Sequence, residues 1–117
     1  MRVLGLDPSL TSTGYGIIEY DQNVWNAVQY GVIKSSPRLP FHQRINTIRL
    51  EIEALIKKHR PEEIAIENPF YAHNVKTAML LGQVRGAILV AIASHDCSLH
   101  EYSALEIKKA MTGYGQA

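Results

Sequence analysis

Two carboxylates occupy matching places in the sequence, each at the end of a short apolar run. Asp7 follows the run at residues 3–6, and Glu67 follows Ile64-Ala65-Ile66. Runs this short, soon closed by turn-forming residues, are typical of buried strands. If the two strands are parallel neighbours, their backbones lie about 4.8 Å apart, and both carboxylates reach one divalent ion. Two hard oxygen ligands favour Mg²⁺, with Mn²⁺ as a substitute, over zinc.

The spacing alone is equally compatible with two acidic residues that form solvated turns. The other residue types that commonly ligate metals give no rival pattern, because the single cysteine and the histidines lack the spacing of a zinc site. We interpret all five histidines as structural or surface residues: His42, His59, His73, His95 and His100. With Cys97 alone, no intrachain disulfide forms, and a reducing cytosol is the natural setting.

The first third of the chain predicts three strands. Residues 3–6 form the first, and residues 13–20 and 24–33 are rich in β-branched and aromatic side chains. Asp21, Gln22 and Asn23 provide turn chemistry between the last two. A three-stranded meander is therefore expected, with Asp7 immediately after its first strand.

Helices and strands alternate in the rest of the chain. Apolar residues recur at steps of three and four from Phe41 onward, which predicts an amphipathic helix that Pro61 stops. A strand at residues 63–67, a helix at 74–94 and a strand at 97–102 follow. The helix at 74–94 is apolar on most sides, so we expect it to be buried.

The last segment predicts a further short helix. Ser103 and Glu106 fit a capping box, and the helix would end near Gly113. The resulting order, β-β-β-α-β-α-β-α, predicts an α/β fold with a mixed five-stranded sheet and helices packed on it. The 117 residues have the length of a single domain.

Composition narrows the classes of function without selecting one. The chain has 12 basic and 11 acidic residues, so its overall charge gives no argument for a nucleic-acid partner. The N-terminus has no signal-peptide core, and the longest apolar run, residues 86–93, is short of the roughly 20 residues of a membrane span. We therefore expect a soluble, cytoplasmic protein with no membrane partner.

Five segments, in order and at matching separations, resemble the RuvC family of Holliday-junction resolvases. They span the whole chain and are Gly5-Leu6-Asp7-Pro8-Ser9, Thr13-Gly14-Tyr15-Gly16, Ala65-Ile66-Glu67, Leu81-Gly82-Gln83-Val84-Arg85-Gly86, and Ile107-Lys108-Lys109 leading into Gly113-Tyr114-Gly115. The resemblance implies an RNase H-like fold. It also implies a Mg²⁺-dependent endonuclease that cuts four-way DNA junctions as a homodimer, in cooperation with the RuvA-RuvB branch-migration complex.

In the family, four acidic or acid-and-histidine positions surround the metal. Asp7 and Glu67 match the first two of them. The family's remaining acidic positions lie on a C-terminal helix, and the sequence stops at Ala117 before reaching it. The resemblance therefore implies a C-terminally truncated domain with half of the catalytic site, inactive as it stands.

The resemblance also implies four DNA-binding residues: Phe70, Asn74, Lys76 and Lys108. Phe70 would stack on an unpaired base at the junction centre, and the other three would face phosphate. Arg85 either contacts phosphate or caps a dimer contact, and the helix that carries Gly82 and Gly86 belongs either to a dimer interface or to the core.

Three other classes of protein compete with this interpretation. Sugar kinases and actin-like ATPases share the sheet, but residues 8–11 lack the glycine of their phosphate loop. A YqgF-like RNA-processing nuclease would have the same fold and acidic plan. A non-catalytic module that binds junctions or forms dimers is the third alternative.

Overall fold

A computed structural model describes residues 1–10, 12–68 and 74–103. Within them lie five strands, β1 (Arg2–Pro8), β2 (Ser12–Asp21), β3 (Val24–Lys34), β4 (Glu63–Asn68) and β5 (Ser98–Ser103), and two helices, α1 (Phe41–His59) and α2 (Val75–Ala93). The predicted order of strands and helices is confirmed over these residues. The predicted last helix falls at residues 104–117, outside the described part.

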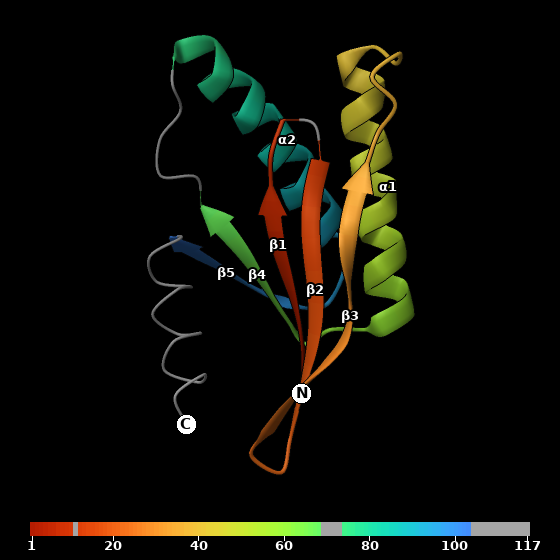
Figure 1. The fold of residues 1–117 in the computed structure, drawn as a ribbon, viewed down its shortest axis with the longest axis vertical. Coiled ribbons are helices and arrows are strands. Elements are labelled where there is room, and N and C mark those ends of the chain that lie inside the picture. The colour runs from red at the N-terminus through yellow and green to blue at the C-terminus, as the bar shows by residue number, and fades with distance from the viewer. Residues whose placement is uncertain (11, 69–73, 104–117) are drawn as a thin grey trace.

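The strands form one mixed sheet in the order β3-β2-β1-β4-β5 (Figure 1). β1, β2 and β3 make an antiparallel meander, whereas β4 lies parallel to β1 and β5 parallel to β4. Each parallel pair needs a crossover connection, which α1 and α2 supply. The sheet confirms the predicted mixed five-stranded α/β fold.

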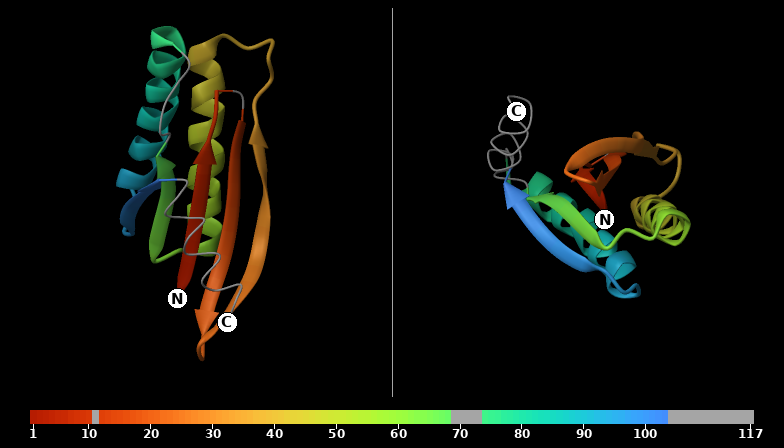
Figure 2. Two further views of the ribbon diagram at one scale, coloured as in Figure 1. Left: turned by 60° about the vertical axis from the view of Figure 1, so that its left-hand side comes forward. Right: turned by 90° about the horizontal axis from the view of Figure 1, so that it is seen from below.

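Both helices pack on one face of the sheet (Figure 2). The side chains of a strand alternate between faces, and the buried residues of β1 and β4 sit at every second position: Leu4, Leu6, Ile64 and Ile66. They share the core with buried isoleucines of α1 and α2. Among the described residues, no helix or strand packs on the other face, where Asp7 and Glu67 lie.

The turn between β2 and β3 has the chemistry that the sequence predicts. Gln22 and Asn23 both have positive φ, of 51° and 66°. Two consecutive residues with positive φ are typical of the turn whose twist suits a two-residue hairpin, and asparagine tolerates that conformation well. β1 extends further than predicted, because Asp7 and Pro8 pair with Gly14 and Thr13 of β2 instead of leaving the sheet.

The first helix stops where predicted. Arg60 adopts a left-handed conformation with φ of 50°, its N–H bonds the carbonyl of Ile56, and Pro61 follows. Because proline disfavours a helical residue before it, the chain leaves α1 here and enters β4. After α1 the chain thus enters β4, which lies beside β1 in the register that puts Glu67 next to Asp7.

The expectation that α2 is buried on most sides is wrong. Val84, Ile88, Ala91 and Ile92 are buried, but Val75, Met79 and Val90 are 76%, 63% and 61% exposed. By length and composition α2 could span a membrane. Its buried stripe nevertheless packs in the same core as the sheet and α1. The helix therefore has one apolar stripe in the core and a second apolar stripe that is exposed.

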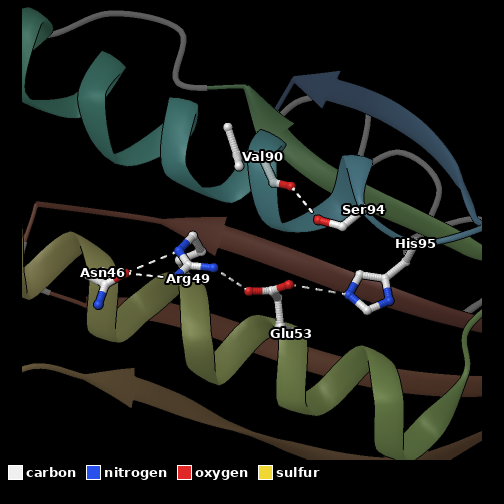
Figure 3. A network of polar contacts seen from close by, with 6 residues as sticks. All are labelled: Asn46, Arg49, Glu53, Val90, Ser94 and His95. Atoms are coloured by element: carbon white, nitrogen blue, oxygen red, sulfur yellow. Dashed lines mark hydrogen bonds and ion pairs between the residues drawn. The ribbon is translucent and has the colours of Figure 1, made fainter.

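A polar network joins the middle of α1 to the end of α2 (Figure 3). Arg49 donates to Asn46 and pairs with Glu53 on α1. The other oxygen of Glu53 lies 3.6 Å from His95 Nε2, just beyond α2. Of these contacts, the one between Glu53 and His95 links the two helices, on the face of the sheet that lacks the carboxylate pair.

Candidate metal centre

Asp7 and Glu67 occupy neighbouring positions on adjacent parallel strands. The register of β1 with β4 pairs Leu4 with Ile64 and Leu6 with Ile66. Asp7 directly follows Leu6 on β1, and Glu67 directly follows Ile66 on β4. Adjacent strands lie about 4.8 Å apart, so the two carboxylates emerge from neighbouring backbones.

The two carboxylates also share a face of the sheet. Because Leu6 and Ile66 point into the core, the residues that follow them point to the opposite, uncovered face. Asp7 is exposed and Glu67 is half-buried. The predicted proximity of the pair therefore agrees with both the register and the alternation.

On this face small residues lie beside Asp7, whereas Tyr102 of β5 is the strand partner of Glu67. Gly14 is the β2 partner of Asp7, and a Cβ built on Gly14 would meet the Asp7 Cβ at 3.8 Å, an ordinary contact. Gly5 and Ala65 precede the carboxylates by two residues on their own strands and pair with each other. The surface on the Asp7 side of the pair is thus low, which leaves room for a large ligand to approach there.

The donor set fits Mg²⁺ and does not fit a structural zinc site. No group of three or more His, Cys, Asp and Glu residues that could hold a metal occurs in residues 1–10, 12–68 and 74–103. Mg²⁺ commonly uses one or two carboxylates and fills its other positions with water and phosphate oxygens. The two carboxylates can therefore hold Mg²⁺ in a site that is open on its outer side.

Arg85 occupies a place that the sequence did not indicate. Its Nη1 donates to the main-chain oxygen of Glu67 at 2.8 Å, and its Nη2 pairs with Oε1 of Glu101 at 2.8 Å. Its side chain is 13% exposed and points inward from α2 to the strand ends. Arg85 and Glu101 are 16 residues apart on different elements, so no local sequence pattern links them.

Asn74 caps the helix that follows the site. Its side-chain oxygen accepts from the Thr77 N–H at 2.8 Å, which satisfies one of the free N–H groups at the start of α2. Lys76 is exposed in the first turn of the same helix. Phe70 and Lys108, the other predicted DNA-binding residues, lie outside the described residues.

Among the described residues, His59 and Cys97 have shifted pKa values. Burial lowers the pKa of His59 below 6.5, and the nearby Lys58 and Arg2 lower it further. Burial raises the pKa of the Cys97 thiol, and Asp96 adds to that shift. A raised pKa makes a thiol a weaker nucleophile and metal ligand at neutral pH, so Cys97 is a poor candidate for chemistry.

A family model described as crossover junction endodeoxyribonuclease RuvC matches residues 3–117. The chain belongs to the RuvC family. A RuvC of Alkaliphilus metalliredigens is 38% identical over 117 residues, which are the whole of this chain and 71% of that protein. A RuvC of Fusobacterium nucleatum is 42% identical over the whole chain and 62% of its own length.

Solved structures agree with the RuvC assignment. Thermus thermophilus RuvC in complex with a Holliday junction substrate is similar with a TM-score of 0.88 and 26% identity, over 96% of this chain and 72% of that one. The yeast mitochondrial Holliday junction resolvase has a TM-score of 0.64 at 13% identity, over 86% of this chain and 50% of that one, and shows a common fold alone. The 117 residues thus span about seven tenths of several RuvC relatives.

Proposed function

We propose that this protein is a Mg²⁺-dependent endonuclease that resolves four-way DNA junctions by paired, symmetric nicks. The observation that carries the proposal is the placement of Asp7 and Glu67 side by side on the open face of the sheet, in a chain of the RuvC family. The relatives are named crossover junction endodeoxyribonucleases, so hydrolysis of a DNA phosphodiester is the reaction of the class. The single cysteine and the DNA substrate are consistent with a cytoplasmic setting.

Asp7 and Glu67 would hold Mg²⁺ through carboxylate oxygens. When bound, the ion supplies charge stabilisation for the phosphate and lowers the pKa of a bound water. The two strands hold the carboxylates in fixed positions, and the glycine beside Asp7 allows the DNA backbone to come close. Phe70, Asn74, Lys76 and Lys108 would contact the junction beside the site.

A homodimer would place two such sites on the two equivalent strands of a junction. We assign the interface to the exposed stripe of α2. Helical geometry puts Met79, Gly86 and Val90 on one side of α2. Gly86 and Val90 also line a groove of about 300 Å³ between α2 and α1. Apart from the nearby backbone of α2 itself, no atom of the described residues lies within 4 Å of a Cβ built on Gly82 or Gly86, so a second copy could approach the helix closely there. Cooperation with the RuvA-RuvB complex is the further partnership that we propose for the dimer.

The test is cleavage of a synthetic four-way junction by the complete gene product in Mg²⁺. Asp7→Asn should reduce cleavage by more than about a hundredfold, the upper end for loss of a group that only supports a metal ligand. Junction binding should be largely retained, because phosphate contacts carry most of the affinity for DNA.

Glu19→Gln is the matched control, since Glu19 is a carboxylate of the same sheet that pairs with Arg2. It should leave cleavage unchanged. If Asp7→Asn lost junction binding together with cleavage, the role of Asp7 as a metal ligand alone would be refuted. Cleavage of structured RNA in preference to the junction would instead favour an RNA-processing nuclease.

A further inference from the structure

Arg85 connects α2 to the end of the strand that carries Glu67. One arm of its guanidinium donates to the main-chain oxygen of Glu67 and the other pairs with Glu101, both at 2.8 Å. Only 13% of the Arg85 side chain is exposed. A guanidinium is planar and always charged, so a buried one with two fixed acceptors has a defined orientation.

The two acceptors belong to neighbouring strands. Glu101 pairs with Ile66 in the parallel register of β4 with β5, and its side chain is on the side of the sheet that the helices cover. The Glu67 carboxylate is on the opposite side. Arg85 therefore bonds the backbone of Glu67 from the helix-covered side of the sheet, whereas the Glu67 carboxylate lies on the open side.

The position of Glu67 at the end of the paired region makes this contact important. The paired register of β1 with β4 ends at Leu6 and Ile66, one residue before the carboxylates. The β5 partner of Glu67 continues to hold it on the other side, through Tyr102. The Arg85 bond adds a second restraint, which comes from a helix anchored in the core by Val84 and Ile88.

We propose that Arg85 is a positioning residue of the metal centre. By fixing the main-chain carbonyl of Glu67, it sets the direction in which the Glu67 carboxylate leaves β4. Glu101 keeps the guanidinium turned toward the strand ends and neutralises its charge, so that the charge does not oppose a cation at the site. The inference rests on the proposed function, and it names a role for two residues that are not metal ligands.

The test measures metal binding in the DNA-free complete gene product. Mn²⁺ is titrated into the protein, and the free ion is followed by electron paramagnetic resonance, with Mg²⁺ added as competitor. Arg85→Met, which keeps most of the aliphatic length and removes both bonds, should weaken Mn²⁺ binding about tenfold, the lower end of the range for groups that support a metal ligand. Arg85→Lys should restore part of the affinity, because lysine keeps the charge and a donor without the planar fork.

Arg49→Met is the matched control. Arg49 also joins a glutamate and a second acceptor, but it does so on α1, which carries neither carboxylate of the site (Figure 3). It should lower stability without changing the affinity for Mn²⁺. Equal loss of Mn²⁺ affinity in Arg49→Met and Arg85→Met would overturn the positioning role, because general loosening would explain both.

Two further variants separate the possible failures. If Arg85→Met does not fold, Glu101→Gln replaces it, since Glu101 is 44% exposed and the change is nearly isosteric. It should weaken Mn²⁺ binding a few-fold, and unchanged binding would overturn the proposal. Asp7→Asn belongs in the same titration: if it has no effect on Mn²⁺ binding, the metal site itself fails. If it abolishes binding while Arg85→Met has no effect, only the positioning role fails.

Discussion

Asp7 and Glu67 differ in exposure although they occupy equivalent strand positions. Asp7 is exposed beside a glycine, whereas Glu67 is half-buried and its backbone is held by Arg85. The two carboxylates should therefore tolerate substitution differently. Asp7 has room for a small rearrangement on its open side, whereas Glu67 is restrained from β5 and from α2.

Phe70 is the residue for which family resemblance makes the sharpest prediction. Phe70→Ala should weaken junction processing by about 1 to 3 kcal/mol, the value of one base stacked on an aromatic ring. The melting temperature of the variant should change little, because a ring that stacks on DNA would contribute little to the core. Junction cleavage and thermal melting of the complete gene product, measured together, check both parts.

A buried phenylalanine would give the reverse pattern. Truncation of a core Phe costs about 3 to 5 kcal/mol of stability. A large drop in melting temperature for Phe70→Ala would therefore refute the stacking role.

His59 predicts a dependence of stability on pH. Its pKa in the folded protein is below the ordinary 6.5, so folding favours the neutral ring. The stability that His59 contributes is complete above about pH 6.5, and it is lost as the pH falls from there toward the folded pKa. The slope from one group reaches at most about 1.4 kcal/mol per pH unit.

Urea unfolding at pH 7.5 and pH 5.5 tests this dependence. His59→Gln, which does not titrate, should lose less stability than the wild-type protein between the two pH values. His42→Gln is the control, because His42 is exposed. If His59→Gln and the wild type lose the same stability, His59 is not the group that links folding to protons.

At the scale of the elements, α2 has a defined beginning that one residue provides. Asn74→Ala should lower the free energy of unfolding by about 1 kcal/mol through loss of the cap. Asn74→Asp should keep the cap and the stability, because aspartate caps equally well and suits the helix dipole. If Asn74 also faces phosphate, the added charge should weaken junction binding at low salt.

Chemical denaturation and a junction-binding titration of the two variants separate these roles. Unchanged junction binding in Asn74→Asp would remove Asn74 from the DNA-binding residues and leave it as a cap alone.

The elements could be predicted well because their signals are local. The period of α1, the turn at Gln22 and Asn23, and the strand that ends near Asp7 all depend on neighbours within a few residues. The exposure of α2 could not be predicted, since an apolar helix looks the same whether its partner is the core or another surface. The bond from Arg85 to Glu67 and Glu101 was also beyond reach, because it depends on how α2 crosses two strands.

At the scale of the whole molecule, the exposed stripe of α2 predicts a dimer. Val90→Glu should convert the complete gene product from a dimer to a monomer, because a charge would be buried without a partner at a two-fold contact. Val24→Glu is the matched control, since Val24 is 53% exposed but lies on the β2–β3 hairpin. Light scattering at several concentrations gives the mass of each variant.

A monomeric wild-type protein at high concentration would contradict the interface. A monomer produced by Val24→Glu but not by Val90→Glu would instead move the interface from α2 to the hairpin.

The alternation of side chains along β1 and β4 limits how the gene can change in length. One residue inserted between Ile64 and Glu67 would turn the Glu67 carboxylate toward the helices, whatever residue was added. An insertion in residues 35–40, between β3 and α1, would leave every strand residue on its own face. Insertions and deletions should therefore accumulate in connections such as residues 35–40 and the tip at Gln22 and Asn23. The stretches from Leu4 to Asp7 and from Ile64 to Glu67 should change by substitution alone.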